Sequence, residues 1–135
     1  MNEQSAKEWL IKAWHNLSSA KILYNADHYT DTIAIELHYA VEKMLKSFLA
    51  YENRKIPKKH DLNEIHSFIV ENISFNESEF ELLDIISGYH IEASYPQYHR
   101  EMPNKEEIEE VLNFSEKLFD KVCLILNMNR QELTQ

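Results

Sequence analysis

Glycine is almost missing from this chain of 135 residues, and Gly88 is the only one. An average protein contains roughly 7% glycine. Tight β-hairpin turns rely on glycine or on Asn-Gly pairs, because their central residues adopt left-handed backbone conformations, and the sequence has no Asn-Gly pair. The scarcity argues against a sheet of hairpins and predicts helices joined by a few simple loops.

Three other scarcities narrow the class of protein. A single cysteine, Cys123, excludes an internal disulfide framework and suits a reducing compartment. No apolar run approaches the roughly 18 residues that span a bilayer, and the polar start of the chain lacks the apolar segment of a signal peptide. We therefore expect a cytoplasmic protein without a membrane association. Lys and Arg number 14 against 23 Asp and Glu, a net charge of -9, which disfavours broad contact with nucleic acid and leaves only local basic patches.

Apolar residues recur at three- and four-residue steps, the spacing of one buried helix face. The pattern predicts long helices over about residues 5–25 and 31–51, a shorter one after residue 61, a fourth from residue 77 to near Gly88, and a last one from residue 105 to about 126. Short connections make neighbouring helices antiparallel. We predict an all-α fold, an antiparallel up-and-down bundle of four to five helices that forms a single domain over residues 1–135.

Candidate capping residues precede four of these helices: Thr30 or Asp31, Asp61, Asn76 and Asn104. Their side-chain oxygens accept hydrogen bonds from the first free backbone N–H groups of a helix. Glu79 and Glu107 follow Asn76 and Asn104 by three positions, the spacing of a capping box. The polar tail from Asn127 is expected to fray.

The seven histidines do not show the spacing of a metal site. A zinc site needs converging ligands, such as two histidines four residues apart on one helix. His60 and His66 are six apart and are expected on different faces, and the others are scattered: His15, His28, His38, His90 and His99. We expect histidines with local hydrogen bonds, no metal and no cofactor. Cys123 lies on the apolar stripe of the last helix and is predicted to be a core residue.

The loop over residues 54–60 is the first candidate binding site. It holds four cations and a histidine just before a helix start: Arg54, Lys55, Lys58, Lys59 and His60. Helix N-termini favour anions, so the loop is suited to a phosphate, a nucleotide or a short RNA, although charge runs are also common in solvated loops. The spacing of Arg54 and His60 also resembles a ribonuclease pair, with His as the base and Arg stabilising the phosphorane.

Two further groups of residues are candidates. Lys43 and Lys46 share a helix face. Either they form a charge pair with Glu42, facing solvent or inside the bundle, or the two lysines line one phosphate-binding groove with His60. Residues 89–103 gather tyrosines, histidines and Arg100 without helical periodicity. A tyrosine such as Tyr95 can stack on a base, or this segment covers the end of the bundle or forms a dimer contact.

The block Leu37–Leu49 resembles the second-helix signature of HEPN domains, with Ala40-Val41-Glu42-Lys43-Met44-Leu45-Lys46 at its centre. Supporting matches lie along most of the chain: Trp9, Ala13 and Ala20 in the first helix, Pro57 and His60-Asp61-Leu62 in the next turn, and Ala93-Ser94-Tyr95-Pro96 further on. In the last segment Ser94 stands where the family has Arg.

The resemblance implies a bundle of four or five helices, a homodimer, and a minimal nucleotidyltransferase as partner, often in a prokaryotic toxin–antitoxin pair. It also implies that members of the wider superfamily are metal-independent ribonucleases with an Arg-x4–6-His motif near the last helix. His99 occupies the His position, Ser94 replaces the Arg, and Arg100 or Arg54 is the remaining candidate.

We therefore expect a nucleotide- or substrate-binding partner of a nucleotidyltransferase. The binding residues of this hypothesis are Lys43, Lys46, Arg54, Lys58, Lys59, His60 and Tyr95. The alternative is an endoribonuclease toxin that uses His99 and Arg100. A purely structural helical adaptor is a third interpretation.

Overall fold

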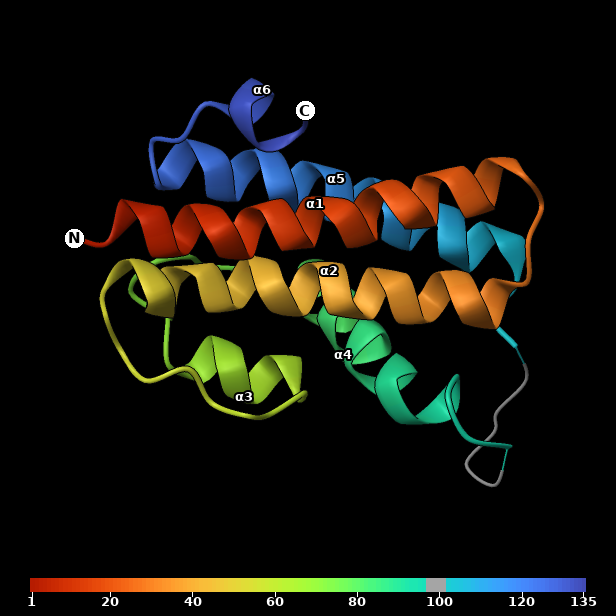
Figure 1. Ribbon diagram of the computed structural model, residues 1–135. Helices are drawn as coiled ribbons and strands as arrows, with labels where there is room; N and C mark the ends of the chain where they lie inside the picture. Colours follow the sequence, from red (N-terminus) through yellow and green to blue (C-terminus); the bar gives the residue numbers. More distant parts are fainter. Residues whose placement is uncertain (97–101) are drawn as a thin grey trace.

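The computed structural model describes residues 1–96 and 102–135, and all regular secondary structure within these ranges is helical (Figure 1). The predicted all-α class is confirmed. The helices are α1 (Glu3–Asn25), α2 (Thr30–Tyr51), α3 (Leu62–Ser67), α4 (Glu77–Glu92), α5 (Lys105–Ile125) and α6 (Arg130–Leu133). No helix in the described part of the chain is both long and apolar enough to cross a membrane.

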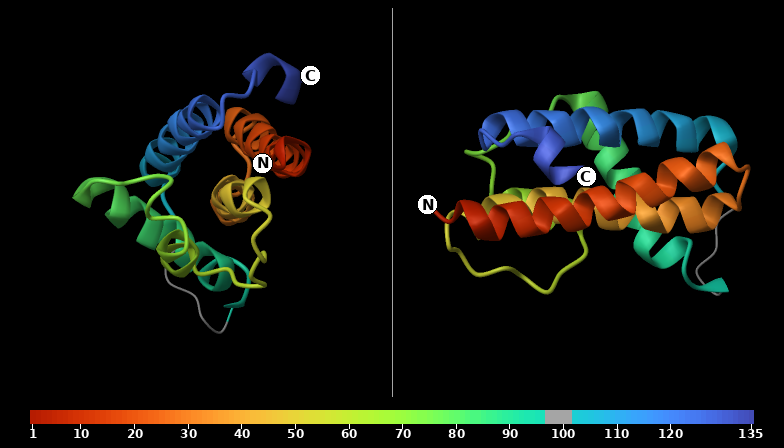
Figure 2. Two further views of the ribbon diagram at one scale, coloured as in Figure 1. Left: turned by 90° about the vertical axis from the view of Figure 1, so that its left-hand side faces the viewer. Right: turned by 45° about the horizontal axis from the view of Figure 1, so that its top comes forward.

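Helix α2 is the centre of the fold. It pairs with α1 in an antiparallel hairpin and also contacts α3, α4 and α5. Figure 2 shows α1, α2 and α5 running alongside one another, while α4 is inclined across α2. Because neighbours cover it on several sides, α2 buries 14 side chains, among them polar ones that would otherwise face water. The surrounding helices therefore enclose polar side chains of α2, including His38, Glu42 and Lys46, inside the protein.

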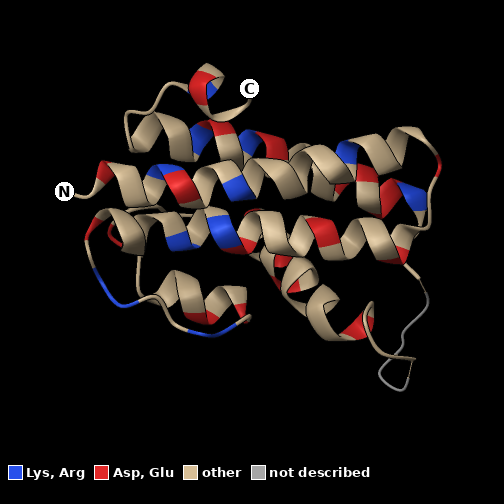
Figure 3. Cartoon of the chain, in the orientation of Figure 1, with Lys and Arg blue, Asp and Glu red and all other residues tan. Residues whose placement is uncertain are grey.

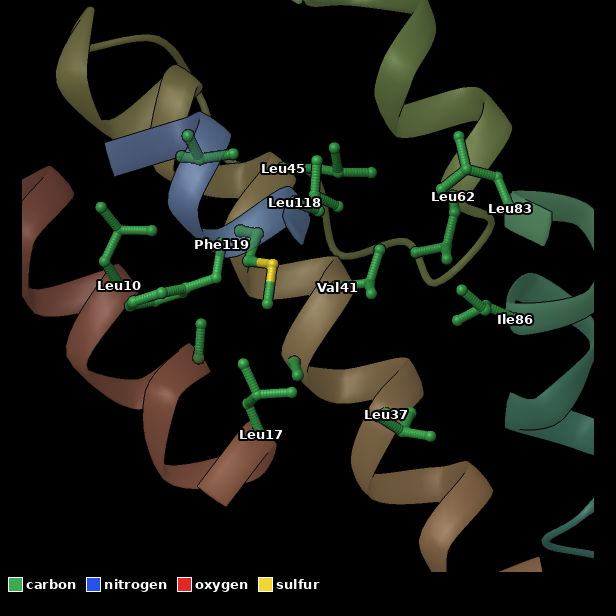
Figure 4. Packing of buried hydrophobic residues seen from close by; sticks show 14 of the residues in the cluster. Leu10, Leu17, Leu37, Val41, Leu45, Leu62, Leu83, Ile86, Leu118 and Phe119 are labelled. Atoms are coloured by element: carbon green, nitrogen blue, oxygen red, sulfur yellow. The ribbon is translucent and has the colours of Figure 1, made fainter. Parts of the chain in front are cut away.

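The hydrophobic core lies on both sides of α2. Figure 4 shows Leu17 of α1 and Phe119 of α5 on one side of Val41. Leu83 and Ile86 of α4 lie on the other side of α2 in the same view. All five side chains are fully buried. The apolar stripes predicted from the sequence therefore meet in a continuous core.

The predicted caps are confirmed at three helices and wrong at one. Asp61 accepts hydrogen bonds from two backbone N–H groups at the start of α3, Asn76 forms a complete capping box with Glu79, and Asn104 accepts from the first turn of α5. Helix α2 begins after Tyr29, which forms no side-chain cap. Thr30 is already helical, so neither it nor Asp31 occupies the cap position.

Three helix ends explain why the chain needs so little glycine. Asp27, Asn53 and Asn127 each follow a helix end and adopt φ values of 54°, 55° and 55°. The next residue in each case donates its N–H to a carbonyl five positions back, as in Arg54 to Leu49 at 2.9 Å and Met128 to Cys123 at 2.9 Å. This is a Schellman motif, in which Asn is the usual substitute for glycine. Short polar residues therefore end α1, α2 and α5.

Two predicted helix limits are corrected. Helix α4 does not end near Gly88 but continues to Glu92, and the φ of Gly88 is not positive. The tail does not fray throughout, because Asn129 caps the short helix α6 and Leu133 is buried. Helix α6 has only four residues, of which Leu133 alone is buried, so it is too short to show an apolar periodicity in the sequence.

Candidate functional site

A row of three polar residues lies on the buried face of α2. His38, Glu42 and Lys46 are spaced by four residues and are only 0%, 5% and 5% exposed. A spacing of four places side chains above one another on a helix. The row faces α4 and the loop before α3, which keep it from solvent.

The carboxylate of Glu42 joins this row to the loop before α3. Lys46 Nζ donates to Glu42 Oε2 at 3.1 Å, while Oε1 lies 3.2 Å from His38 Nε2 and 2.7 Å from His60 Nδ1. Burial raises the pKa of Glu42, but hydrogen bonds from His38 and His60, together with Lys46, outweigh it and hold the pKa at about 2. Glu42 is therefore an anion with three basic neighbours.

A third histidine completes the cluster. His90 of α4 stacks on His60, with ring centroids 4.0 Å apart and an interplanar angle of 18°. Its ring centroid is 5.3 Å from that of His38. Burial lowers the pKa of His90, and the charges of His60 and His38 lower it further. The pKa of His90 is therefore lower than that of a free histidine, which favours the neutral ring. We call His38, Glu42, Lys46, His60 and His90 the histidine cluster.

A separate groove follows the predicted basic loop. It has a volume of about 760 Å³ and is lined by Leu49, Arg54, Lys55, Ile56, Pro57, Lys58, Lys59 and Phe68. We call it the basic groove. Figure 3 shows two short basic stretches on this loop, between α2 and α3. The groove combines cations with an apolar floor.

The cations of the basic groove differ in their partners. Arg54 pairs with Glu52 at 3.3 Å and Lys59 with Glu64 at 2.7 Å. Within residues 1–96 and 102–135, Lys55 and Lys58 form no ion pair, and both are exposed. These two lysines are therefore available to an anionic ligand.

The other predicted site residues do not share this groove. Lys46 and His60 meet at Glu42, but Lys43 turns toward α1, where its Nζ donates to Asn16 Oδ1 at 2.6 Å. The single groove predicted for Lys43, Lys46 and His60 is therefore not formed. Tyr95 follows the end of α4 and is half exposed. His99 and Arg100 lie outside the described residues.

Three members of the histidine cluster were not predicted as site residues: His38, Glu42 and His90. The signal that was present is His38-x3-Glu42, a histidine and a carboxylate four residues apart on one helix. A search for two histidines at that spacing does not detect a histidine paired with a carboxylate. Cys123 is buried, as predicted, and burial raises its pKa to about 11, so it is not a nucleophile.

The HEPN domain model matches residues 6–126, which is most of the chain. The chain belongs to the HEPN domain family. This HEPN domain also resembles the crystal structure of TT1696 from Thermus thermophilus, with a TM-score of 0.78 and 24% sequence identity. The match covers 93% of this chain and 99% of that chain, and it shows the same fold. No curated protein matches the chain significantly.

Proposed function

We propose that this HEPN domain binds a nucleotide, or a substrate that carries a phosphate, as the partner of a minimal nucleotidyltransferase. In this proposal it acts as a cytoplasmic homodimer in a toxin–antitoxin-like pair. The observation that carries the proposal is the basic groove, whose lining includes Lys55 and Lys58, two lysines without ion-pair partners in the described part of the chain.

The groove offers the two kinds of contact that a nucleotide needs. Lys55 and Lys58 supply positive charge for phosphate oxygens. Ile56, Pro57 and Phe68 supply an apolar surface of a kind on which a base can pack. In a chain with a net charge of -9, this local concentration of cations runs against the overall sign. The groove is therefore a local site at which electrostatic attraction could hold an anionic ligand.

Isothermal titration calorimetry with ATP tests the proposal. ATP is titrated into the purified protein alone, and into its mixture with a minimal nucleotidyltransferase encoded beside its gene. We expect heat of binding in at least one of the two titrations. No heat in either would overturn the proposal. RNA cleavage in EDTA that disappears in a His99→Ala variant would favour the endoribonuclease instead.

A further inference from the structure

Three potential metal ligands converge at one end of the histidine cluster. His38 Nε2, Glu42 Oε1 and His60 Nδ1 all lie within 4.8 Å of one another. Ligand atoms at the usual zinc distances are separated by about 2.9 Å in an octahedral site and about 3.3 Å in a tetrahedral one. The observed separations from Glu42 Oε1, 2.7 Å and 3.2 Å, are close to these values.

The hydrogen bond on the other side of His38 orients its ring and fixes which nitrogen faces the carboxylate of Glu42. His38 Nδ1 lies 2.8 Å from the backbone oxygen of Ile86. A carbonyl oxygen only accepts, so Nδ1 carries the proton and donates. Nε2 is then the nitrogen that faces Glu42 Oε1, at 3.2 Å, where it either donates a second proton to the carboxylate or offers a lone pair to a cation.

The surroundings of His38 and Glu42 match those of metal ligands in other respects. Metal-bound histidines usually donate their other ring N–H to a carbonyl or carboxylate, which orients the ring. Ile86 supplies that carbonyl. Lys46 holds the second oxygen of Glu42, Oε2, at 3.1 Å and so leaves Oε1 directed at the histidines. The orientations of His38 and Glu42 are therefore fixed by Ile86 and Lys46 before any metal binds.

We propose that His38, Glu42 and His60 bind a divalent first-row metal ion, with zinc as the best match. Two histidines and one carboxylate form a donor set that zinc and iron accept. Three protein ligands leave at least one coordination position open. His60 is the ligand with an exposed side chain, 47% accessible, so the open position lies toward solvent. A water molecule or an anionic ligand would occupy it.

His90 covers the same site without joining the three ligands. Its ring is stacked on His60 at 18° and packs against His38. Stacking restricts the ring of His60 and keeps Nδ1 on the side of Glu42. His90 is therefore a positioning residue for the metal site rather than a ligand.

Cobalt titration of the tag-free, full-length protein tests the site. Co²⁺ bound by nitrogen and oxygen ligands absorbs visible light according to its coordination. We expect one equivalent per chain to produce this absorption and one equivalent of Zn²⁺ to abolish it. His60→Ala should weaken binding at least tenfold. His60 is partly exposed, so this variant should keep its fold, and circular dichroism checks that it does.

His15→Ala is the matched control, because His15 is an exposed histidine of α1 far along the chain from the three ligands. It should bind cobalt like the wild type. The absence of stoichiometric uptake would overturn the proposal. Equal cobalt affinity in the wild type and His60→Ala would also overturn it. The same would follow if His15→Ala lost as much cobalt affinity as His60→Ala. The titration contains no nucleotide, so its failure leaves the proposed nucleotide binding untouched, and failed ATP binding leaves the metal site untouched.

Discussion

Glu42 Oε1 lies 2.7 Å from His60 Nδ1, a contact that joins the buried face of the central helix to the loop before α3. Glu42 comes from inside the HEPN signature block of α2, and His60 is the last residue of the basic loop. The contact therefore anchors the loop that lines the basic groove. It also shows why Glu42 remains charged although it is buried, since the carboxylate has partners on both oxygens.

Replacing Glu42 by alanine should destabilise the protein strongly. Lys46 is 5% exposed and its ammonium would lose its anionic partner. Leaving one member of a buried ion pair without the other costs about 3 to 5 kcal/mol. Urea denaturation measures the free energy of unfolding. Glu64→Ala removes the partner of Lys59 at the surface and should change stability little. Equal effects of the two variants would contradict the described burial of Glu42.

Asn127 should tolerate glycine but not alanine. Its φ of 55° is left-handed, where a Cβ is costly by about 1 to 2 kcal/mol unless the residue is Asn or Gly. Asn127→Ala should lower the thermal midpoint, and Asn127→Gly should leave it nearly unchanged. Asn113→Ala is the same substitution at an exposed position inside α5 and should be neutral or stabilising. A tolerated alanine at 127 would contradict the Schellman end of α5.

Phe119→Ala should remove one of the largest core contacts. The ring is fully buried, and its centroid lies 5.8 Å from the ring centroid of Trp14 in α1. It therefore holds α5 against the α1–α2 hairpin. Truncating a buried Phe costs about 3 to 5 kcal/mol. Leu124→Ala in the same helix, at 81% exposure, is the control and should have little effect. Similar chemical denaturation midpoints for both variants would show that α5 does not pack as described.

Cys123 should resist thiol reagents in the folded protein. Burial raises its pKa from 9.0 to about 11 and covers the sulfur. A pKa raised by folding means that the neutral thiol is favoured in the native state. The associated stability is complete below pH 9 and is lost as the pH rises from 9 toward 11. Reaction with a disulfide reagent at a pH of about 8 should be slow, because little thiolate is present. Unfolding in urea should expose the thiol and make the reaction fast. Rapid reaction of the native protein would show that the thiol is accessible.

The helices were predictable from the sequence because their signals are local. Apolar stripes and the caps at Asp61, Asn76 and Asn104 each depend on a few neighbouring residues. The left-handed ends at Asp27, Asn53 and Asn127 are local too, but they lack the glycine that usually marks a helix end. Asn and Asp after a helix carry the same information, and they explain why glycine is so scarce in this chain.

The histidine cluster could not be predicted in the same way. His38, His60 and His90 belong to α2, to a loop and to α4, and only the packing of α4 across α2 brings them together. Lys43 and Lys46 show the same limit. They are three residues apart on one helix, yet one faces α1 and the other is buried beside Glu42. Which face of α2 another helix covers depends on the packing of the whole bundle, and the local sequence does not show it.

Binding of a fluorescent ATP analogue to groove variants is the most direct measurement of the proposed function. The double variant Lys55→Ala/Lys58→Ala removes the two groove lysines, and Lys12→Ala/Lys117→Ala removes the same charge from exposed positions elsewhere. We expect the groove variant to bind at least tenfold more weakly than the wild type and the control variant to bind normally. Equal affinity in all three proteins, or an equal loss in both variants, would contradict a nucleotide site in the basic groove.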